Sequence, residues 1–218
     1  MGLQTSLSDH DTVLAADTST IINLNATGCA EDILKALPYR VAVVDVIADE
    51  LEIGRSKGRK DASKLSALVT AKLVDVVSLG NDGLIHFEGL VIGAASETLD
   101  DGEAATIAYA VETNAVALID ERKALRLCAS RFTNVRLGCT VDIFAHPTVR
   151  RALGASSLAD AVYRALLDAR MRVLPHHLAG VVELIGPERA ANCLSLPLEA
   201  RTRLASKRNL GARNARNR

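Results

Sequence analysis

The sequence predicts an α/β protein: a three-layer α/β/α sandwich around a central parallel sheet, followed by a C-terminal helical extension. Short apolar runs alternate with longer helical patterns, which is typical of parallel βαβ units with helices on both faces of a sheet. The composition points the same way, because 49% of the residues are apolar while only 3% are aromatic and none is Trp. The core must therefore be built from Leu, Ile, Val and Ala, which suits helices packed on a buried sheet.

The expected strands are short and apolar. The continuous apolar run at 41–44 indicates a strand that is buried on both faces, and the run at 115–119 is equally clear. The runs at 74–79 and 135–137 are weaker. In chain order the predicted strands are 12–16, 41–44, 74–79, 115–119 and 135–137.

The segments between these strands have the periodicity of helices. Up to residue 145 the predicted helices are 19–26, 30–37, 46–53, 62–71, 101–112, 121–131 and 141–145. The segment 80–98 is rich in Gly, so we predict a loop there, with room for a hairpin.

The strand signals stop at Pro147, and helical patterns follow at 157–170, at 177–185 and from Pro187. From Arg201 onward there are seven basic residues and no acid, which leaves 19 basic against 26 acidic residues before that point. Such a tail should be disordered, and its charge suits either phosphate contacts or simple solubility. The predicted parts are a catalytic domain at 11–147, a helical extension at 148–200 and a basic tail at 201–218.

Several classes of protein are excluded or disfavoured. The N-terminus has no basic region followed by an apolar run, so it is not a secretory signal. No apolar run approaches the roughly 20 residues that cross a bilayer, so we expect a cytoplasmic protein without membrane contact. The sequence contains no P-loop motif. The end of the first predicted strand also lacks the D-x-D signature of aspartate-nucleophile phosphatases, because Ser19 follows Asp17 and Thr18 there.

The four cysteines are scattered without a C-x-x-C pair. This spacing argues against both a disulfide framework and a zinc site, and it fits a reducing cytosol. His176 and His177 are adjacent, and neighbours on a helix cannot easily face one metal ion. We therefore predict that these two histidines are surface or packing residues.

Acidic residues follow three of the predicted strands. Asp17, Asp45 and Asp120 each come directly after a strand, and Glu121 is next to Asp120. Ligands of a parallel α/β sheet bind outside the carboxyl ends of the strands, which is where these side chains should lie. An Asp between a strand and a helix is also an ordinary N-cap, so each residue alone is better explained as a cap.

Glu50 has a less ordinary position. On a helix with 3.6 residues per turn, Glu50 lies within the apolar stripe formed by Val46, Ile47, Leu51 and Ile53. A carboxylate among apolar neighbours costs several kcal/mol unless it is paired or binds a metal. The alternative is a short helix whose end is exposed.

Glu103 lies in the first turn of the 101–112 helix, on the same side as Ile107. Here the alternative is specific, because Asp100 and Glu103 have the spacing of a capping box. Capping and metal binding do not exclude each other.

Four acids, Asp17, Glu50, Glu103 and Asp120, are thus expected on the carboxyl side of the sheet. Like charges packed together repel, and their pKa values rise unless a cation joins them. Ligands that are all oxygen favour Mg²⁺ or Mn²⁺ over zinc. Such a cluster activates a water and steadies the leaving oxygen in phosphodiester cleavage.

Four motifs in order resemble those of PIN-domain nucleases. The run DTSTII at 17–22 is similar to the opening motif, and VIADEL at 46–51 looks like the second. DGEAATIAYA at 101–110 resembles the third, an acid heading an Ala-rich helix, and LIDERK at 118–123 the fourth. Each motif alone is weak, but their order and spacing agree. The helical C-terminus resembles a bacterial and archaeal PIN-like branch that is related to VapC-type toxins.

The resemblance implies a single-strand-directed endoribonuclease that depends on Mg²⁺ or Mn²⁺, and a toxin of a toxin–antitoxin pair. Its implied catalytic metal ligands are Asp17, Glu50, Glu103 and Asp120. Glu121 would be an auxiliary acid at the metal, and Ser19 would orient a ligand or water. The implied partners are single-stranded RNA, with DNA as a further substrate, an antitoxin and a second copy of the chain. Asp45 and Asp142 depart from the family pattern, and either could substitute for one of the acids.

Basic residues near the acids are candidates for phosphate contacts. Arg55 and Lys57 lie in a glycine-punctuated loop after Glu50, and Arg122 and Lys123 adjoin Asp120. The alternative for the loop is simple solvation.

Two other functions remain open. One is a non-catalytic scaffold that keeps the fold for binding RNA or a protein, with the acids as caps. The other is a different Mg²⁺-dependent enzyme that acts on a small phosphate ester.

Overall fold

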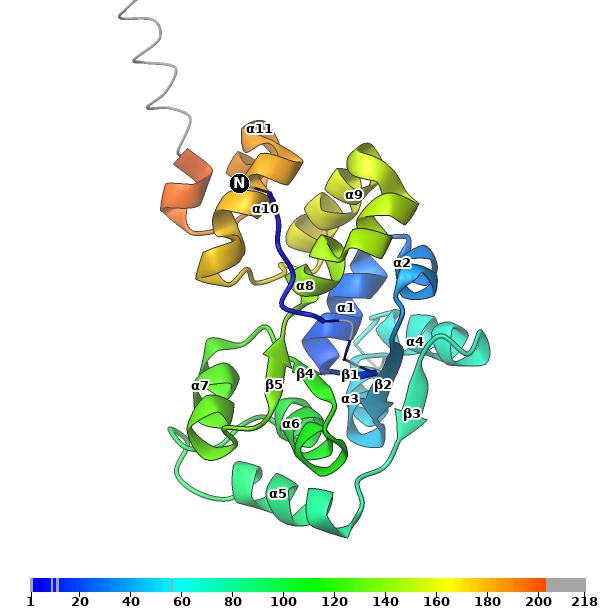
Figure 1. Ribbon diagram of the computed structural model, residues 1–218, viewed down its shortest axis with the longest axis vertical. Coiled ribbons are helices and arrows are strands. Elements are labelled where there is room, and N and C mark those ends of the chain that lie inside the picture. Colours follow the sequence, from blue (N-terminus) through cyan, green and yellow to red (C-terminus); the bar gives the residue numbers. More distant parts are fainter. Residues whose placement is uncertain (1, 9, 11, 56, 203–218) are drawn as a thin grey trace, which may run out of the picture.

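A single parallel sheet forms the centre of the computed structural model, which describes residues 2–8, 10, 12–55 and 57–202 (Figure 1). The strands lie in the order β3-β2-β1-β4-β5, so that β1 is central. All four neighbouring pairs are parallel; Leu14 of β1, for example, pairs with Val41 on one side and Val116 on the other. The strands are β1 (Val13–Ala16), β2 (Arg40–Val44), β3 (Asp75–Val77), β4 (Val116–Leu118) and β5 (Arg136–Gly138). The predicted fold class is therefore confirmed.

Helices connect the strands and cover both faces of the sheet. The helices up to residue 145 are α1 (Thr18–Ala26), α2 (Ala30–Ala36), α3 (Asp45–Arg55), α4 (Asp61–Thr70), α5 (Asn81–Val91), α6 (Asp101–Thr113), α7 (Arg122–Arg131) and α8 (Thr140–Ala145). The C-terminal part contains α9 (Pro147–Asp168), the 3₁₀ helix η1 (Pro175–His177), α10 (Leu178–Ile185) and α11 (Pro187–Asn192).

Two apolar clusters fill the two sides of the sheet, because successive strand residues point to opposite faces. Leu14 and Ala16 belong to one cluster, which α1, α2 and the C-terminal helices complete. Ala15, between them, belongs to the other, with residues of α6 and α7. The first cluster runs without interruption from the strands to Val162 of α9 and Val181 of α10. The helices after Pro147 thus share the core of the sheet.

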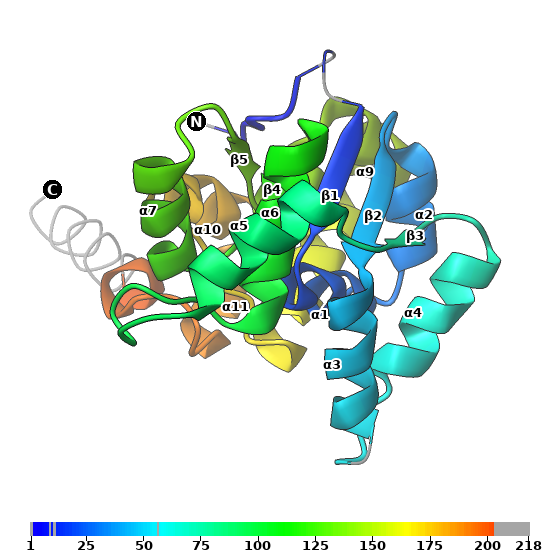
Figure 2. The ribbon, with the colours of Figure 1, turned by 90° about the horizontal axis from the view of Figure 1, so that it is seen from below.

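The loop predicted at 80–98 is wrong over much of its length, because residues 81–91 form helix α5. This helix lies beside α6 (Figure 2). A Cβ atom on Gly83 would lie 2.6 Å from the Glu112 carboxylate of α6, and the Gly80 amide donates to that carboxylate. The glycines therefore permit close approach of two helices. Burial of Leu90 offsets the cost of about 1 kcal/mol that a helical Gly carries.

Helix α9 begins earlier than the sequence pattern predicted. Pro147 occupies its first turn, where the missing N–H costs nothing. Gly154 interrupts the helix with a φ of 71°, a conformation that favours Gly. The predicted start near residue 157 thus corresponds to the part of α9 after this break. Most of the predicted basic tail, residues 203–218, lies outside the described residues.

No helix in the described part of the chain combines the length and the apolar character needed to span a membrane.

Candidate active site

Asp17 ends the central strand and begins α1. It is 2% exposed, and one carboxylate oxygen accepts a hydrogen bond of 2.6 Å from the Thr20 amide. The Ser19 hydroxyl donates to the other oxygen at 2.8 Å. Asp17 is therefore the N-cap of α1, which is the alternative that the sequence offered for it. Unlike an ordinary surface cap, it is buried, and it lies at the carboxyl edge of the sheet. Through this hydrogen bond Ser19 orients the Asp17 carboxylate.

Asp120 follows β4, the neighbour of β1, and is 3% exposed. The Thr140 amide donates to one oxygen at 2.9 Å, and the Asn23 side chain donates to the other at 2.8 Å. The Thr140 hydroxyl also donates to Asp120. Side chains from α1 and α8 thus fix this carboxylate from two directions. Neither Asn23 nor Thr140 could be recognised from the sequence, because they are 97 and 20 residues away from Asp120.

Glu50 projects from α3 toward the start of α6. The Gly102 amide donates to its Oε1 at 3.1 Å, and the Thr18 hydroxyl donates to its Oε2. The side chain is half-buried. Its unusual place in an apolar stripe is therefore explained by contacts with α1 and α6 rather than by a frayed helix end.

Glu103 is half-buried in the first turn of α6. Burial raises the pKa of its carboxyl to about 7, with further contributions from the negative charges of Asp100 and Asp17. The side chain accepts a hydrogen bond from the Asp100 backbone, while the Asp100 side chain makes no capping bond. Only half of the expected capping box forms, so capping alone does not account for Glu103.

The four acids interact electrostatically, with Asp17 at the centre. Burial is the largest cause that raises the pKa of Asp17, and the charge of Glu50 raises it further. Burial likewise raises the pKa of Asp120 to about 7, and here the charge of Asp17 is the second cause. Asp17 also raises the pKa of Glu103. These like charges oppose one another unless protons or a cation neutralise them.

The donor set suits a hard divalent cation. It consists of carboxylate oxygens, which Mg²⁺ and Mn²⁺ prefer, and each oxygen accepts more than one contact. Among the residues that the structure describes, no three of these acids place a carboxylate oxygen within 4.8 Å of one another. Mg²⁺ usually keeps several of its waters, so a wider arrangement of carboxylates still fits it.

A cavity of about 270 Å³ is lined by two of the four acids, Glu103 and Asp120, but not by Asp17 or Glu50. Its polar lining residues are Ser19, Asn23, Glu103, Asp120, Glu121, Arg170 and Arg172. Glu121 forms an ion pair with Arg172, which approaches from the segment between α9 and η1. Glu121, expected as an auxiliary acid, is thus neutralised by an arginine that lies 51 residues later in the sequence and that the sequence did not identify.

The basic residues predicted for phosphate contact lie elsewhere or have other contacts. Lys123 donates to the Ala95 carbonyl at 2.7 Å, and Arg55 pairs with Glu52 at 2.9 Å on an exposed surface. Arg122 and Lys57 are exposed. None of the four lines the cavity, where Arg170 and Arg172 are found instead.

The two acids considered as substitutes have separate partners. The Asp45 carboxylate accepts hydrogen bonds from the Val46 amide at 2.9 Å and the Ser78 hydroxyl at 2.7 Å. Asp142 contacts the Ser6 amide and Cys139. Neither of the two lines the cavity beside Asp120.

Gly102 makes a testable contribution to this site. A Cβ atom there would lie 2.7 Å from the Thr18 hydroxyl and 2.8 Å from Glu50 Oε2. Gly102→Ala should therefore displace the Glu50 carboxylate and weaken Mn²⁺ binding by about 10-fold or more, as loss of a ligand's supporting contact typically does. Calorimetric titration with Mn²⁺ measures this effect.

Gly89→Ala is the matched control, because Gly89 lies within helix α5 with open space around its Cβ position. This variant should bind Mn²⁺ as the wild type does. Equal affinities for Gly102→Ala and the wild type would mean that Glu50 takes no part in ion binding.

The fold and the site define an α/β protein with a buried carboxylate cluster at the carboxyl edge of its parallel sheet. Residues 13–187 match the family model of a PIN domain, which is most of the chain, so this protein belongs to the PIN domain family. PIN domains are generally nucleases.

One solved structure that contains a similar chain is the crystal structure of VapBC2 from Rickettsia felis, which is bound to a DNA fragment from the VapBC2 promoter. The match has 17% sequence identity and a TM-score of 0.41, and it covers 59% of this chain and 98% of that chain. Among the curated proteins that were compared, none matches.

Proposed function

We propose that this protein is a metal-dependent endoribonuclease that hydrolyses phosphodiester bonds of single-stranded RNA. The observation that carries the proposal is the acidic cluster, in which buried Asp17 interacts with Glu50, Glu103 and Asp120 at the edge of the sheet. Membership in a family whose domains are generally nucleases supports the class of reaction.

Asp17, Glu50, Glu103 and Asp120 would hold Mg²⁺ or Mn²⁺. A bound ion of this kind lowers the pKa of water and stabilises negative charge on phosphate oxygens. The repulsion among the four carboxylates supports this assignment, because a divalent cation relieves it without the need for protons.

The supporting residues position the carboxylates. Ser19 holds Asp17, Thr18 and the Gly102 amide hold Glu50, and Asn23 and Thr140 hold Asp120. Such contacts fix the orientation of a ligand before an ion or substrate arrives, which reduces the cost of assembling the site.

Glu103 is the acid best suited to exchange a proton. Its pKa of about 7 lies near neutral pH, where a group passes between its two protonation states most readily. It also lines the cavity, so a water or leaving oxygen there would be within its reach.

The substrate would enter through the cavity beside Asp120. Arg170 and Arg172 also line this cavity, and a guanidinium group matches the geometry of a phosphate. A cavity of about 270 Å³ suits one strand whose bases can turn outward better than the stacked pairs of a duplex.

We include an antitoxin protein and a second copy of the chain as partners, because the resemblance to VapC-type toxins implies both. Exposed Ile53, Ile85 and Ile92 offer apolar surface outside the cavity for such contacts.

The experiment that tests the function is incubation of the purified protein with a mixed-sequence single-stranded RNA, in Mn²⁺ and in EDTA. We expect cleavage with Mn²⁺ and none with EDTA. Parallel reactions with duplex RNA, single-stranded DNA and a mononucleotide ester define the substrate class.

Each alternative has its own result. Binding of RNA without cleavage in any metal would favour the non-catalytic scaffold. Cleavage of the mononucleotide ester but not of the oligonucleotide would favour an enzyme for small phosphate esters.

A further inference from the structure

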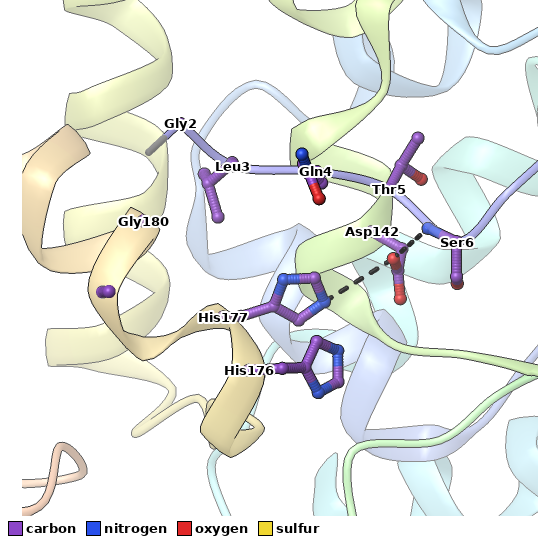
Figure 3. Close-up of a pocket in the computed structure, with 10 residues that line it drawn as sticks. Gly2, Leu3, Gln4, Thr5, Ser6, Asp142, His176, His177 and Gly180 are labelled. Atoms are coloured by element: carbon purple, nitrogen blue, oxygen red, sulfur yellow. Dashed lines mark hydrogen bonds and ion pairs between the residues drawn. The ribbon is translucent and has the colours of Figure 1, made fainter.

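A second group of ligating side chains lies apart from the acidic cluster. Cys139 and Asp142, at the start of α8, meet His177, at the end of η1. Figure 3 shows Asp142 and His177 of this group. All three side chains are buried, and one potential ligand atom from each lies within 4.8 Å of the other two. Sulfur, oxygen and nitrogen donors of this kind are the ligands that Zn²⁺ takes in proteins.

Asp142 is the centre of this group. Its Oδ1 accepts a hydrogen bond of 2.6 Å from the Ser6 amide and lies 3.5 Å from His177 Nε2. Its Oδ2 accepts from the Cys139 amide at 2.9 Å and from the Cys139 thiol at 3.0 Å. Burial alone would raise the pKa of Asp142, but the adjacent imidazole, thiol and Ser6 amide hold it at about 2.

The Nε2 atom of His177 is buried and poorly satisfied. The residue is only 5% exposed, and among the described residues Nε2 makes no regular hydrogen bond, only the 3.5 Å contact with Asp142 Oδ1. Figure 3 shows this side of the ring turned toward Asp142. A buried nitrogen without a partner costs free energy, so each such atom requires an explanation.

There is room for an additional ligand at this position. A cavity of about 400 Å³ opens beside Asp142 and His177. The N-terminal segment of residues 2–6 forms one side, and exposed His176 lies at its margin (Figure 3). A water or a fourth side chain could complete a coordination sphere from there.

We infer that Cys139, Asp142 and His177 form a binding site for Zn²⁺ or a similar thiophilic divalent cation, with the fourth position turned to this cavity. Tetrahedral Zn²⁺ with bonds of about 2.0–2.3 Å places its ligand atoms roughly 3.3–3.6 Å apart. Cys139 Sγ lies 3.0 Å from Asp142 Oδ2, and His177 Nε2 lies 3.5 Å from Asp142 Oδ1, so each distance is near that spacing but to a different carboxylate oxygen. On binding, the thiol loses its proton to solvent and the thiolate takes its place on the ion.

The site would connect three parts of the fold. Cys139 and Asp142 lie beside β5, His177 belongs to the C-terminal helices, and Ser6 reaches the same carboxylate from the N-terminal segment. Leu3 packs against Gly180 of α10: a Cβ atom added to Gly180 would lie 3.1 Å from the Leu3 side chain. This contact anchors the N-terminal segment to α10. An ion at this site would therefore act as a structural cross-link, separate from the acidic cluster.

Titration of the reduced full-length protein with Co²⁺ tests the inference, without reference to nuclease activity. A Co²⁺ ion bound through Cys gives a thiolate charge-transfer band, which an oxygen-only site does not give. We expect a saturable band in the wild type that Zn²⁺ abolishes. Cys139→Ser should remove the band, and His177→Gln should weaken Co²⁺ binding by about 10-fold or more.

Two matched variants complete the experiment. Cys29→Ser removes a cysteine that lies outside the group, and Asp17→Asn alters the acidic cluster; both should keep the band. Circular dichroism establishes that each variant is folded. If Cys139→Ser does not fold, His177→Gln decides, because it retains the thiol.

The inference is overturned if the wild type gives no thiolate band. It is equally overturned if the band survives in folded Cys139→Ser, or if His177→Gln binds Co²⁺ with wild-type affinity. None of these three results would affect the proposed nuclease, whose test is RNA cleavage.

Discussion

Asp17→Asn should reduce cleavage of single-stranded RNA by at least about 100-fold in saturating Mn²⁺, since loss of even a supporting contact of a metal ligand costs 10- to 100-fold. Asn keeps an oxygen that can accept the Thr20 amide, so the cap on α1 and the fold should survive. What the substitution removes is the charge that interacts with the other three acids. Initial rates of cleavage, with circular dichroism to establish folding, measure the effect.

Asp45→Asn is the matched control for this experiment. Asp45 also lies at a strand end, but its carboxylate contacts Val46 and Ser78. Its variant should cleave RNA at a rate close to that of the wild type. If both variants retain full activity, the carboxyl edge of the sheet is not the catalytic site.

Without divalent ions, Asp120 should make the protein less stable as the pH rises. Its pKa is about 7 in the folded protein, against 3.8 for an ordinary Asp. The folded state therefore binds the proton more tightly, so the stabilisation is complete below about pH 4 and is lost as the pH rises through about 7. Between pH 5 and 8 this loss should amount to about 2–4 kcal/mol.

Chemical denaturation in EDTA at pH 5 and pH 8 measures this effect, with Asp120→Asn as the comparison. The stability of the variant relative to the wild type should increase from pH 5 to pH 8, because Asn does not titrate. Asp45→Asn is the control, since the Asp45 carboxylate contacts Val46 and Ser78 and not the acidic cluster. If the difference in the free energy of unfolding between Asp120→Asn and the wild type is the same at pH 5 and pH 8, the raised pKa of Asp120 is contradicted.

The central elements of the fold were predictable from local sequence. The apolar runs that became β1, β2 and β4 are buried over residues 14–16, 41–44 and 116–118, which is the burial that a continuous apolar run predicts. Helix α5 was not predictable, because Gly80 and Gly83 indicate a loop by local rules. Their role is to let α5 approach Glu112 of α6, and that is a tertiary contact.

For the candidate site, the sequence pointed to the acids but not to the residues that hold them. The strand ends identified Asp17 and Asp120, and the misfit with an apolar stripe identified Glu50. The partners that fix these acids, Asn23 and Thr140 among them, become neighbours only when the chain folds.

The same limit applies to the cysteine-containing group. The absence of a C-x-x-C pair argued against zinc, but His177 is 38 positions after Cys139 in the sequence. Its proximity to Asp142 depends on how the C-terminal helices pack. Spacing along the chain carries no information about such a site.

Cys139 and Thr140 are adjacent in the turn between β5 and α8, and they serve different carboxylates. The Thr140 amide and hydroxyl hold Asp120, while the Cys139 thiol and amide hold Asp142. One peptide unit therefore separates the two groups, and a shift of this turn that improves one geometry alters the other. If an ion at Cys139 changes the affinity of the acidic cluster for its own ion by some factor, then an ion at the acidic cluster must, by thermodynamic reciprocity, change the affinity of the Cys139 site by the same factor.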